Sequence, residues 1–237
     1  MEVGLAHDFN NLLTIVTSNL AVLHERYAEL PAVKEFVEPA LQASRRGVGL
    51  IKRLLAFARP QPLEPEVVEV ALPIENLTHL LRRSLPENIR IHTEYCAEPP
   101  PYVVADPHRL ESALINIAVN ARDAMPDGGE LRIKVATENI EGDTAQEFEI
   151  VPGNHVKIEV TDSGTGMSSE TLARALEPFF STKPFGSGSG LGLSMVYGFV
   201  KQLGGAIRIR SEPRHGTTVS ILLPWLPSRN AQPPSNR

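Results

Sequence analysis

Four polar side chains interrupt the apolar pattern of LAHDFNNLLTIV, the segment at residues 5–16. They include His7, whose neutral imidazole would be a competent nucleophile near pH 7. The solvent-exposed face of an ordinary helix carries polar residues of the same types, so this segment alone leaves two interpretations open. The segment is either a reaction site or the solvent-exposed face of a helix, and the rest of the chain decides between these two interpretations.

A pair of asparagines lies in ESALINIAVNARDAM, at residues 111–125. The sequence predicts a helix here, capped by Asp106 and with Pro107 in its first turn. Asn116 and Asn120 are four residues apart and therefore share one face of that helix. Asparagine in an apolar helix usually has a structural role, but its amide oxygen also suits Mg²⁺ when phosphates supply most of the negative charge.

Two glycine-rich segments follow, DSGTGM at residues 162–167 and GSGSGLGLSMVYGFV at residues 186–200. A glycine loop that leads into a helix can bind phosphate, because bare backbone N–H groups and the positive end of the helix dipole converge there. Neither segment has the G-x-x-x-x-G-K-[ST] spacing of a P-loop, and leucine at position 191 breaks the G-x-G-x-x-G spacing of dinucleotide-binding proteins. The H-R-D and D-F-G motifs of protein kinases are also absent from the sequence, so these three classes are excluded.

Two amphipathic helices are expected to carry the first of these segments. Apolar residues recur at alternating steps of three and four along the first helix: Leu5, Phe9, Leu12, Val16, Leu20 and Leu23. A second such run follows Pro31 and extends to Ala58, so residues 1–59 are predicted to form an antiparallel helical hairpin. Two helices cannot bury a stripe of this length, whereas two copies of the hairpin can form a four-helix bundle, so we expect a homodimer. The alternative is that the stripe packs against the second domain of the same chain.

The remaining chain is predicted to form a second domain of mixed helices and strands. Three prolines stop the second helix, so residues 60–66 are expected to be a semi-rigid linker. Residues 67–226 then form the domain, and residues 227–237 have the composition of a disordered tail. We expect strands near residues 67–70, 89–95, 102–105, 130–138, 155–161, 206–211 and 217–223. Helices are expected near residues 72–84, 107–124, 169–176 and 191–203, and an acidic loop is expected at residues 139–154.

Composition excludes several classes of protein. The 237 residues suffice for one or two domains, and 42% apolar with 22% charged residues is typical of soluble proteins. A net charge of -5 disfavours a nucleic-acid-binding protein. No apolar run approaches the ~18 residues of a membrane span, so no membrane contact is expected within this fragment. The single cysteine, Cys96, excludes an intrachain disulfide and favours a cytoplasmic location, although a longer parent protein could be attached to a membrane.

In their order along the chain, these segments resemble the motif boxes of sensor histidine kinases, the phosphotransferases of two-component signal transduction. LAHDFNNLL resembles the phospho-accepting histidine box, INIAVNARDAM the N box and TDSGTGM the G1 box. EPFFSTK resembles the F box, GSGLGLS the G2 box and GTTVSILLP the closing G3 strand. Six boxes in order between about Gly4 and Pro224 make a specific match, whereas any one of them would not.

The resemblance implies an α+β architecture. A dimerisation and histidine-phosphotransfer hairpin, forming a dimeric four-helix bundle, would precede an α/β-sandwich ATP-binding domain of the Bergerat type. The implied activity is autophosphorylation of His7 with ATP and Mg²⁺, followed by phosphotransfer to an aspartate of a response-regulator receiver domain. Asp8 would act as the general base. Asn11 would orient the water that hydrolyses the aspartyl-phosphate of the receiver, which implies a phosphatase activity as well.

The same resemblance assigns residues of the second domain to nucleotide binding. Asn120 would bind Mg²⁺, and Asp162 would accept a hydrogen bond from the exocyclic amine of adenine. Gly164 and Gly166 would let the backbone pass close to the base, and residues 167–190 would form a mobile lid. The other residues expected to anchor that lid or contact the nucleotide are Asn116, Asp123, Phe179, Phe180, Lys183, Gly188, Gly190, Leu191, Gly192, Thr217 and Thr218.

Helical geometry supports the same interpretation of the first segment. At 100° per residue, His7 lies roughly 160–200° from the apolar stripe of its helix. It is therefore predicted to project into solvent, where an ATP-loaded domain can reach it. The polar residues of this segment are accordingly interpreted as the reaction site.

Two other functions share parts of this pattern. The ATPases of chaperones, type II topoisomerases and mismatch-repair proteins have the same fold, but they place a water-activating glutamate one turn before the magnesium asparagine. Here that position is Asn116, which cannot accept a proton, so an ATPase that acts as a conformational switch is the alternative. A catalytically inactive dimeric scaffold is the other alternative.

The chain also departs from the family pattern at two places. Asp123 stands where many family members have a basic residue, so Arg122 or Lys183 would have to supply the cation near the phosphates. Only six residues precede His7, so we expect the first helix to be shortened and a sensor segment to be missing.

Overall fold

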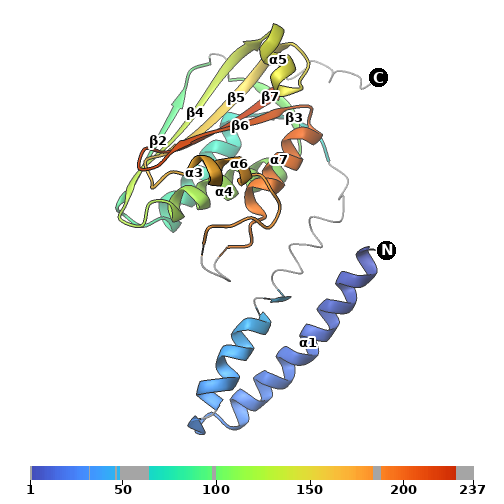
Figure 1. The fold of residues 1–237 in the computed structure, drawn as a ribbon. Coiled ribbons are helices and arrows are strands. Elements are labelled where there is room, and N and C mark those ends of the chain that lie inside the picture. The colour runs from blue at the N-terminus through green and yellow to red at the C-terminus, as the bar shows by residue number, and fades with distance from the viewer. Residues whose placement is uncertain are drawn as a thin grey trace. The chain divides into compact units, whose positions relative to one another are not determined.

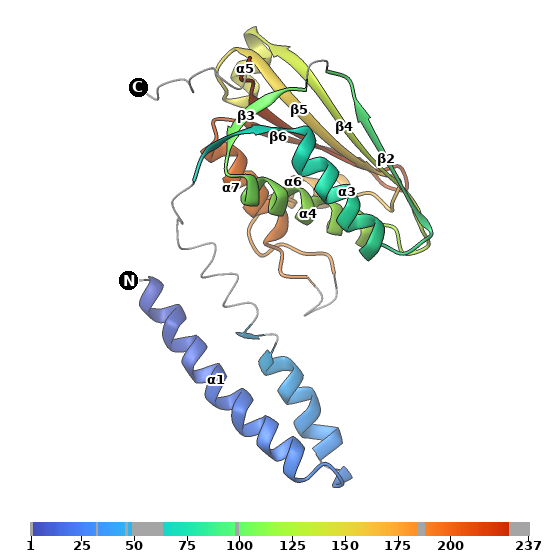
Figure 2. The same ribbon diagram turned by 180° about the vertical axis from the view of Figure 1, so that it is seen from behind.

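The computed structural model describes residues 2–31, 33–45, 47–48, 64–97, 100–183 and 188–227, with the side chains of the first helix from residue 12 onward. The chain divides into two compact units. One comprises Met1–Pro62 with Ser181–Ser189, and the other comprises Leu63–Phe180 with Gly190–Arg237. Figures 1 and 2 show the ribbon from two opposite sides.

The first unit contains a helical hairpin. Its first helix, α1, spans Glu2–Arg26, and a π-helical turn, η1 (Val33–Val37), opens the second segment, which is α-helical at residues 38–45. The two segments touch where the Thr17 and Ser44 hydroxyl oxygens lie 2.6 Å apart. A Cβ added to Gly47 would lie only 2.9 Å from Leu13 Cδ1, so this glycine marks close packing. The rest of the predicted second helix, residues 49–58, lies outside the described residues.

The contact between these helices uses a different face of α1 from the predicted apolar stripe. Leu13 and Thr17 lie at the contact. Leu12, Val16 and Leu23 of the stripe are 60%, 46% and 43% exposed. The single hairpin therefore leaves a large part of the stripe in solvent.

The second unit is built on a five-stranded sheet with the order β2-β4-β5-β7-β6. Its strands are β2 (Ile89–Tyr95), β4 (Gly129–Ile140), β5 (Gly153–Asp162), β6 (Ala206–Glu212) and β7 (Gly216–Pro224). β2 pairs with β4 in parallel, and the other neighbouring pairs are antiparallel. A separate ribbon pairs β1 (Glu66–Glu69) with β3 (Tyr102–Ala105). Each of these strands lies within two residues of its predicted position.

Helices cover one face of the sheet, as both views show (Figures 1 and 2). They are α3 (Ala71–Ser84), α4 (Pro107–Asp123), the short α6 (Ser169–Arg174) and α7 (Gly192–Gln202). α4 begins as predicted, because the Asp106 side chain accepts a hydrogen bond from the Arg109 N–H at 3.1 Å and Pro107 is its first residue.

The main core lies between these helices and the sheet. Ile133 of β4 and Ile158 of β5 are fully buried on the inner face, and α4 contributes Leu110 and Leu114. Burial of each side chain of this size stabilises the fold by about 1.5–3 kcal/mol. The ends of α4, β5, β7 and α7, which carry the candidate site, are therefore attached to a rigid two-layer core.

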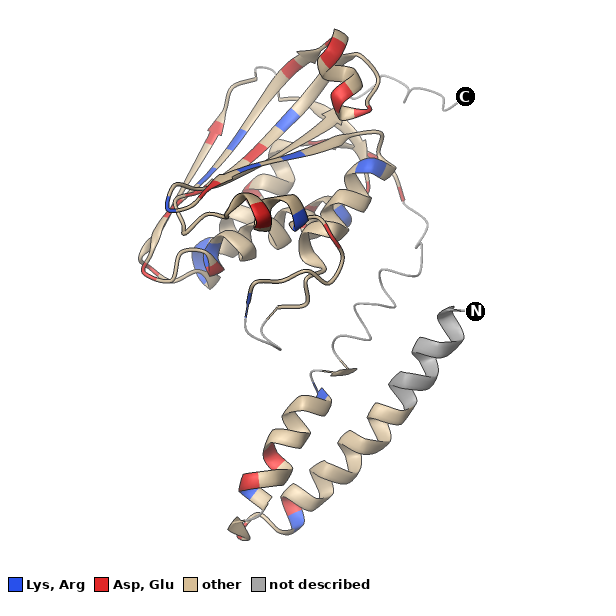
Figure 3. Ribbon diagram, viewed as in Figure 1, with Lys and Arg blue, Asp and Glu red and all other residues tan. Residues whose placement is uncertain are grey.

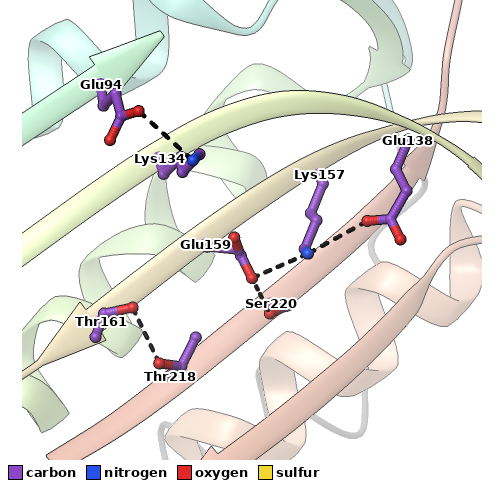
Figure 4. Close-up of polar contacts among 8 residues, drawn as sticks. All are labelled: Glu94, Lys134, Glu138, Lys157, Glu159, Thr161, Thr218 and Ser220. Carbon is purple, nitrogen blue, oxygen red and sulfur yellow. Dashed lines mark hydrogen bonds and ion pairs between the residues drawn. The ribbon is translucent and has the colours of Figure 1, made fainter. Parts of the chain in front are cut away.

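The opposite face of the sheet is polar. Lys157 of β5 lies between Glu138 and Glu159, with Nζ 3.2 and 3.1 Å from their carboxylate oxygens (Figure 4). Ser220 of β7 donates a hydrogen bond to Glu159 at 3.1 Å. Basic and acidic residues are interspersed along these strands (Figure 3). The charges of this face therefore balance one another. Each partly exposed ion pair of this kind contributes only about 0–1 kcal/mol to the stability of the fold.

The prediction of an acidic loop at residues 139–154 is wrong. A helix, α5 (Gly142–Phe148), lies within it. Ala145 of this helix packs with Ile140 and Ile150 in a small cluster that is separate from the main core. Ile140, Ala145 and Ile150 are spaced five residues apart, which matches neither the helical nor the strand period. The sequence pattern therefore does not predict this helix, and tertiary packing stabilises it.

Candidate functional site

Asp162, the last residue of β5, is a buried carboxylate. It is 6% exposed, and its Oδ1 accepts a hydrogen bond from the Gly164 N–H at 2.8 Å. Burial raises the pKa of Asp162 above its ordinary value, while the backbone N–H groups of Gly164 and Thr217 lower it. The fold therefore fixes this side chain in one orientation with two backbone donors.

The glycines of the loop after Asp162 are required by contacts within the protein. A Cβ on Gly164 would lie 2.5 Å from the carbonyl oxygen of Ala124, at the end of α4. Gly166 has φ +64° and its Cβ would overlap the carbonyl oxygen of Glu212 on β6. The loop is thus clamped between α4 and the β6–β7 hairpin, a constraint that the glycine pattern alone did not reveal.

Asn116 and Asn120 lie together against the start of α7. A Cβ on Gly192, the first residue of that helix, would lie 3.6 Å from Asn120 Nδ2 and 3.7 Å from Asn116 Oδ1. These are ordinary contact distances, so the two amides and the first turn of α7 adjoin. Leu191, just before Gly192, is 1% exposed and fixes this helix end in the core. The first turn of such a helix presents unpaired N–H groups that favour an anion.

A backbone hydrogen bond joins Phe179, inside the predicted lid, to Gly190 at the end of the lid. The Phe179 N–H donates to the Gly190 carbonyl oxygen at 2.9 Å, and both residues have positive φ, 68° and 64°. A Cβ on Gly190 would overlap the Phe179 backbone. The Phe179 ring is 53% exposed, whereas the Phe180 ring lies under the Arg174 guanidinium, 4.1 Å from Cζ to the ring centroid. The Phe179 anchor is therefore its backbone and not its ring.

Within the predicted lid, Lys183 and Gly188 lie close together. The Lys183 N–H donates to Ser181 Oγ at 3.2 Å, and a Cβ on Gly188 would lie 2.7 Å from Ser181 Oγ and 3.1 Å from Lys183 Cδ. The residues between them, 184–187, lie outside the described part of the chain.

Asp123 and Arg122 form an ion pair with each other, with 2.7 Å between Arg122 Nη2 and Asp123 Oδ1. The Arg122 guanidinium also donates through Nε at 2.9 Å to the same oxygen. Arg122 is therefore engaged by its neighbour, which weakens its candidacy as the cation near the phosphates.

Thr217 lies beside Asp162 in the β5–β7 ladder, as its register partner. It also lines a pocket of about 470 Å³, together with Leu172 of α6 and Ser211 and Gly216 of the β6–β7 hairpin. Asp162 and Asn120 do not line this pocket, which therefore reaches only the Thr217 end of the candidate site. Thr218 also lines this pocket, and its hydroxyl shares a hydrogen bond of 3.0 Å with Thr161 on the outer face of the sheet (Figure 4).

The side chains of the candidate site suit a metal ion that is already bound to the phosphates of a nucleotide. Among the residues that the structure describes, no three His, Cys, Asp or Glu side chains cluster in a way that could hold a metal ion. An amide oxygen such as that of Asn120 can supply one ligand to Mg²⁺ while phosphate oxygens supply most of the others. The residues present therefore fit Mg²⁺ carried by a nucleotide.

His7, Asp8 and Asn11 lie on α1, but their side chains are outside the described part of the chain. Their predicted direction into solvent stays a prediction. No helix in the described residues is long and apolar enough to cross a membrane.

With this geometry, comparison with known sequences defines the class of protein. The chain belongs to the family of histidine kinase-, DNA gyrase B- and HSP90-like ATPases, whose sequence pattern matches residues 105–227. Its second unit is therefore an ATP-binding domain of this family. The chain is 40% identical, over 94% of its length, to the sensor kinase CckA of Brucella abortus, of which it spans 24%. It spans about a quarter to a half of the curated relatives that it matches.

Two solved structures share the fold across both units. ShkA, determined at full length in complex with AMPPNP, aligns with a TM-score of 0.68 and 23% identity, covering 94% of this chain and 45% of ShkA. The histidine kinase ThkA, determined in complex with the response regulator protein TrrA, aligns with a TM-score of 0.63 and 22% identity, covering 96% of this chain and 61% of ThkA. At these identities the likeness establishes the fold.

Proposed function

We propose that this chain is the catalytic core of a sensor histidine kinase. It transfers the terminal phosphate of ATP to His7 and then to an aspartate of a response-regulator receiver domain. The observation that carries the proposal is that one domain of this ATPase family holds both a buried Asp162 carboxylate and two α4 amides, Asn116 and Asn120, that adjoin the start of α7. The relatives named as sensor kinases support the same assignment.

Each end of the proposed site has a distinct task. Asp162 would accept a hydrogen bond from the exocyclic amine of adenine. The first turn of α7, from Gly192, would bind phosphate through its N–H groups. Asn120 would ligate Mg²⁺, which neutralises phosphate charge when bound. The protein's contribution is then positioning and charge neutralisation, as expected for phosphoryl transfer.

The acceptor chemistry belongs to His7. One ring nitrogen would attack the γ-phosphorus in line, forming an N–P bond as the bond from phosphorus to the bridging oxygen breaks and ADP leaves with that electron pair. Asp8 would hold the proton on the other nitrogen and stabilise the positive charge that develops on the ring. The phosphoryl group on nitrogen then remains available for transfer to a carboxylate of the receiver.

Asn116 favours a kinase over an ATPase switch. In the rival ATPases a carboxylate one turn before the magnesium asparagine activates water. The amide of Asn116, which faces Gly192, cannot take a proton from water. ATP bound here would therefore persist until a nucleophile from elsewhere, His7, reaches it.

The proposal includes a homodimer in the cytoplasm, where ATP and receiver domains occur. Leu12, Ile15, Val16 and Leu23 are 43–60% exposed on α1, and apolar side chains in such a stripe favour burial against a second copy. We expect the chain to sediment as a dimer, Val16→Glu to sediment as a monomer, and Ser18→Glu, on the exposed polar face, to remain dimeric. A wild-type chain that stays monomeric at micromolar concentration would contradict the dimer.

Transfer from labelled ATP tests the proposed activity. Incubation with γ-labelled ATP and Mg²⁺ is expected to label the chain with a phosphate that is lost in acid and retained in base, as for phosphohistidine. Addition of a panel of receiver domains should then move the label to one of them. An unlabelled chain, or a label that survives acid, would overturn the proposal.

A further inference from the structure

The hydroxyl of Ser211, on β6, occupies the centre of a hydrogen-bond cluster beside the candidate site. Its oxygen lies 2.9 Å from the Gly216 carbonyl oxygen, 2.8 Å from the Met167 N–H nitrogen and 2.8 Å from Thr217 Oγ1. A serine hydroxyl has one proton and two lone pairs, so three partners use its full capacity. No motif or periodicity in the sequence distinguishes this serine.

The chemistry of the three partners fixes where each proton lies. The Gly216 carbonyl can only accept, so the single Ser211 proton is directed to it. The Met167 N–H can only donate, so it takes one lone pair of Ser211. The contact with Thr217 then requires the Thr217 hydroxyl to donate its proton to Ser211. The Thr217 oxygen is left with lone pairs alone for any other partner.

Thr217 stands next to the Asp162 carboxylate. The two residues are paired across β5 and β7, so their side chains lie on the same face of the sheet. The Thr217 N–H also lowers the pKa of Asp162 by donating to its carboxylate. This end of the site therefore presents a carboxylate and a hydroxyl oxygen that both act as acceptors, and Thr217 lines an adjoining pocket.

Ser211 also attaches the loop at residues 163–167 to the hairpin. Besides the bond from Met167, the Arg214 N–H donates to the Thr165 carbonyl oxygen at 2.7 Å. Of these two hydrogen bonds, the one from Met167 is accepted by a side chain, that of Ser211. The same Ser211 hydroxyl contacts Thr217. Loss of its hydroxyl would leave one donor and one acceptor without their partner and would release the Thr217 proton.

We propose that Ser211 is a positioning residue that sets the preference of this site for adenine over guanine. Adenine carries an amine where guanine carries a carbonyl oxygen, so two fixed acceptors favour the first base and repel the second. Ser211 acts through Thr217 by keeping its hydroxyl an acceptor. This inference rests on the proposed ATP-binding function and concerns the selectivity of that same site.

The test compares the binding of ATP and GTP, each with Mg²⁺, by calorimetry on the whole chain. We expect Ser211→Ala to weaken ATP binding by about tenfold and to lower the ATP:GTP affinity ratio by at least about tenfold, because Thr217 becomes free to donate to the guanine carbonyl. Ser211→Thr, which keeps a hydroxyl, should restore the ratio. Ser220→Ala, which removes the hydrogen bond to Glu159 on the outer face, should leave the ratio unchanged.

The possible results separate this inference from the proposed function. A wild-type chain that binds no ATP overturns both. If the wild type binds ATP and Ser211→Ala has the same ATP:GTP affinity ratio as the wild type, the role of Ser211 alone is overturned. This holds even if the variant melts at a lower temperature. If Ser211→Ala does not fold, Thr217→Val decides: it should weaken ATP binding about tenfold, and unchanged ATP binding would overturn the acceptor role of Thr217.

Discussion

Replacing His7 with glutamine is expected to abolish the acid-labile label that γ-labelled ATP leaves on the chain. Glutamine keeps a polar side chain and a good helix propensity at this position of α1 but has no nucleophilic nitrogen, since its amide lone pair is delocalised. ATP binding should be unchanged, because Asp162, Asn120 and Gly192, the groups proposed to bind adenine, Mg²⁺ and phosphate, belong to the other unit. The measurement is phosphorimaging after separate acid and alkaline treatment, with calorimetric ATP affinity as the second readout.

His24 provides a matched control for this substitution. It is a second histidine on α1, in the last turn of that helix. His24→Gln is expected to retain labelling at close to the wild-type level. Label that persists in His7→Gln, or that disappears in His24→Gln and not in His7→Gln, would assign the acceptor elsewhere.

The strands and most helices of the second unit could be predicted from sequence because local signals and tertiary contacts agree there. Along β4 and β5, alternation of apolar and polar residues matches one face packed on helices and one face in solvent. At α4, Asp106 and Pro107 give a capping signal that the structure confirms. α5 could not be predicted, because its only buried residue, Ala145, belongs to a cluster that is completed by Ala206 and Leu222, which are distant in the sequence.

The candidate site likewise contains residues that the sequence could predict and residues that it could not. Asn116, Asn120 and Asp162 could be selected because the motif boxes fix their type and spacing. The reason for Gly166 differs from the expected one, since its missing Cβ makes room for the carbonyl oxygen of Glu212, about 46 residues later in the chain. Ser211 was missed for the same physical reason: its role depends on three bonds that form only after the hairpin and the loop have come together.

The second large effect is expected for Asn120→Ala. Alanine is the better helix former by about 0.5 kcal/mol, so α4 and the fold should persist. In the described residues no group of three His, Cys, Asp or Glu side chains could hold the metal ion instead, so loss of the Asn120 oxygen is expected to weaken Mg²⁺ binding. We expect labelling of His7 to fall by at least about 100-fold, the scale of losing one metal-positioning group from a phosphoryl-transfer site.

The metal role of Asn120 is separable from a general loss of nucleotide binding by titrating Mg²⁺. In the wild type, Mg²⁺ should strengthen ATP binding, and in Asn120→Ala most of that enhancement should be lost while metal-free ATP binds about as before. Asn139→Ala is the matched control, because Asn139 is exposed on β4 and its Nδ2 donates a hydrogen bond to Glu141 Oε1 at 2.6 Å, away from the candidate site. Equal Mg²⁺ enhancement in Asn120→Ala and the wild type would show that Asn120 contacts the nucleotide without binding the metal, and unchanged labelling would remove it from the site altogether.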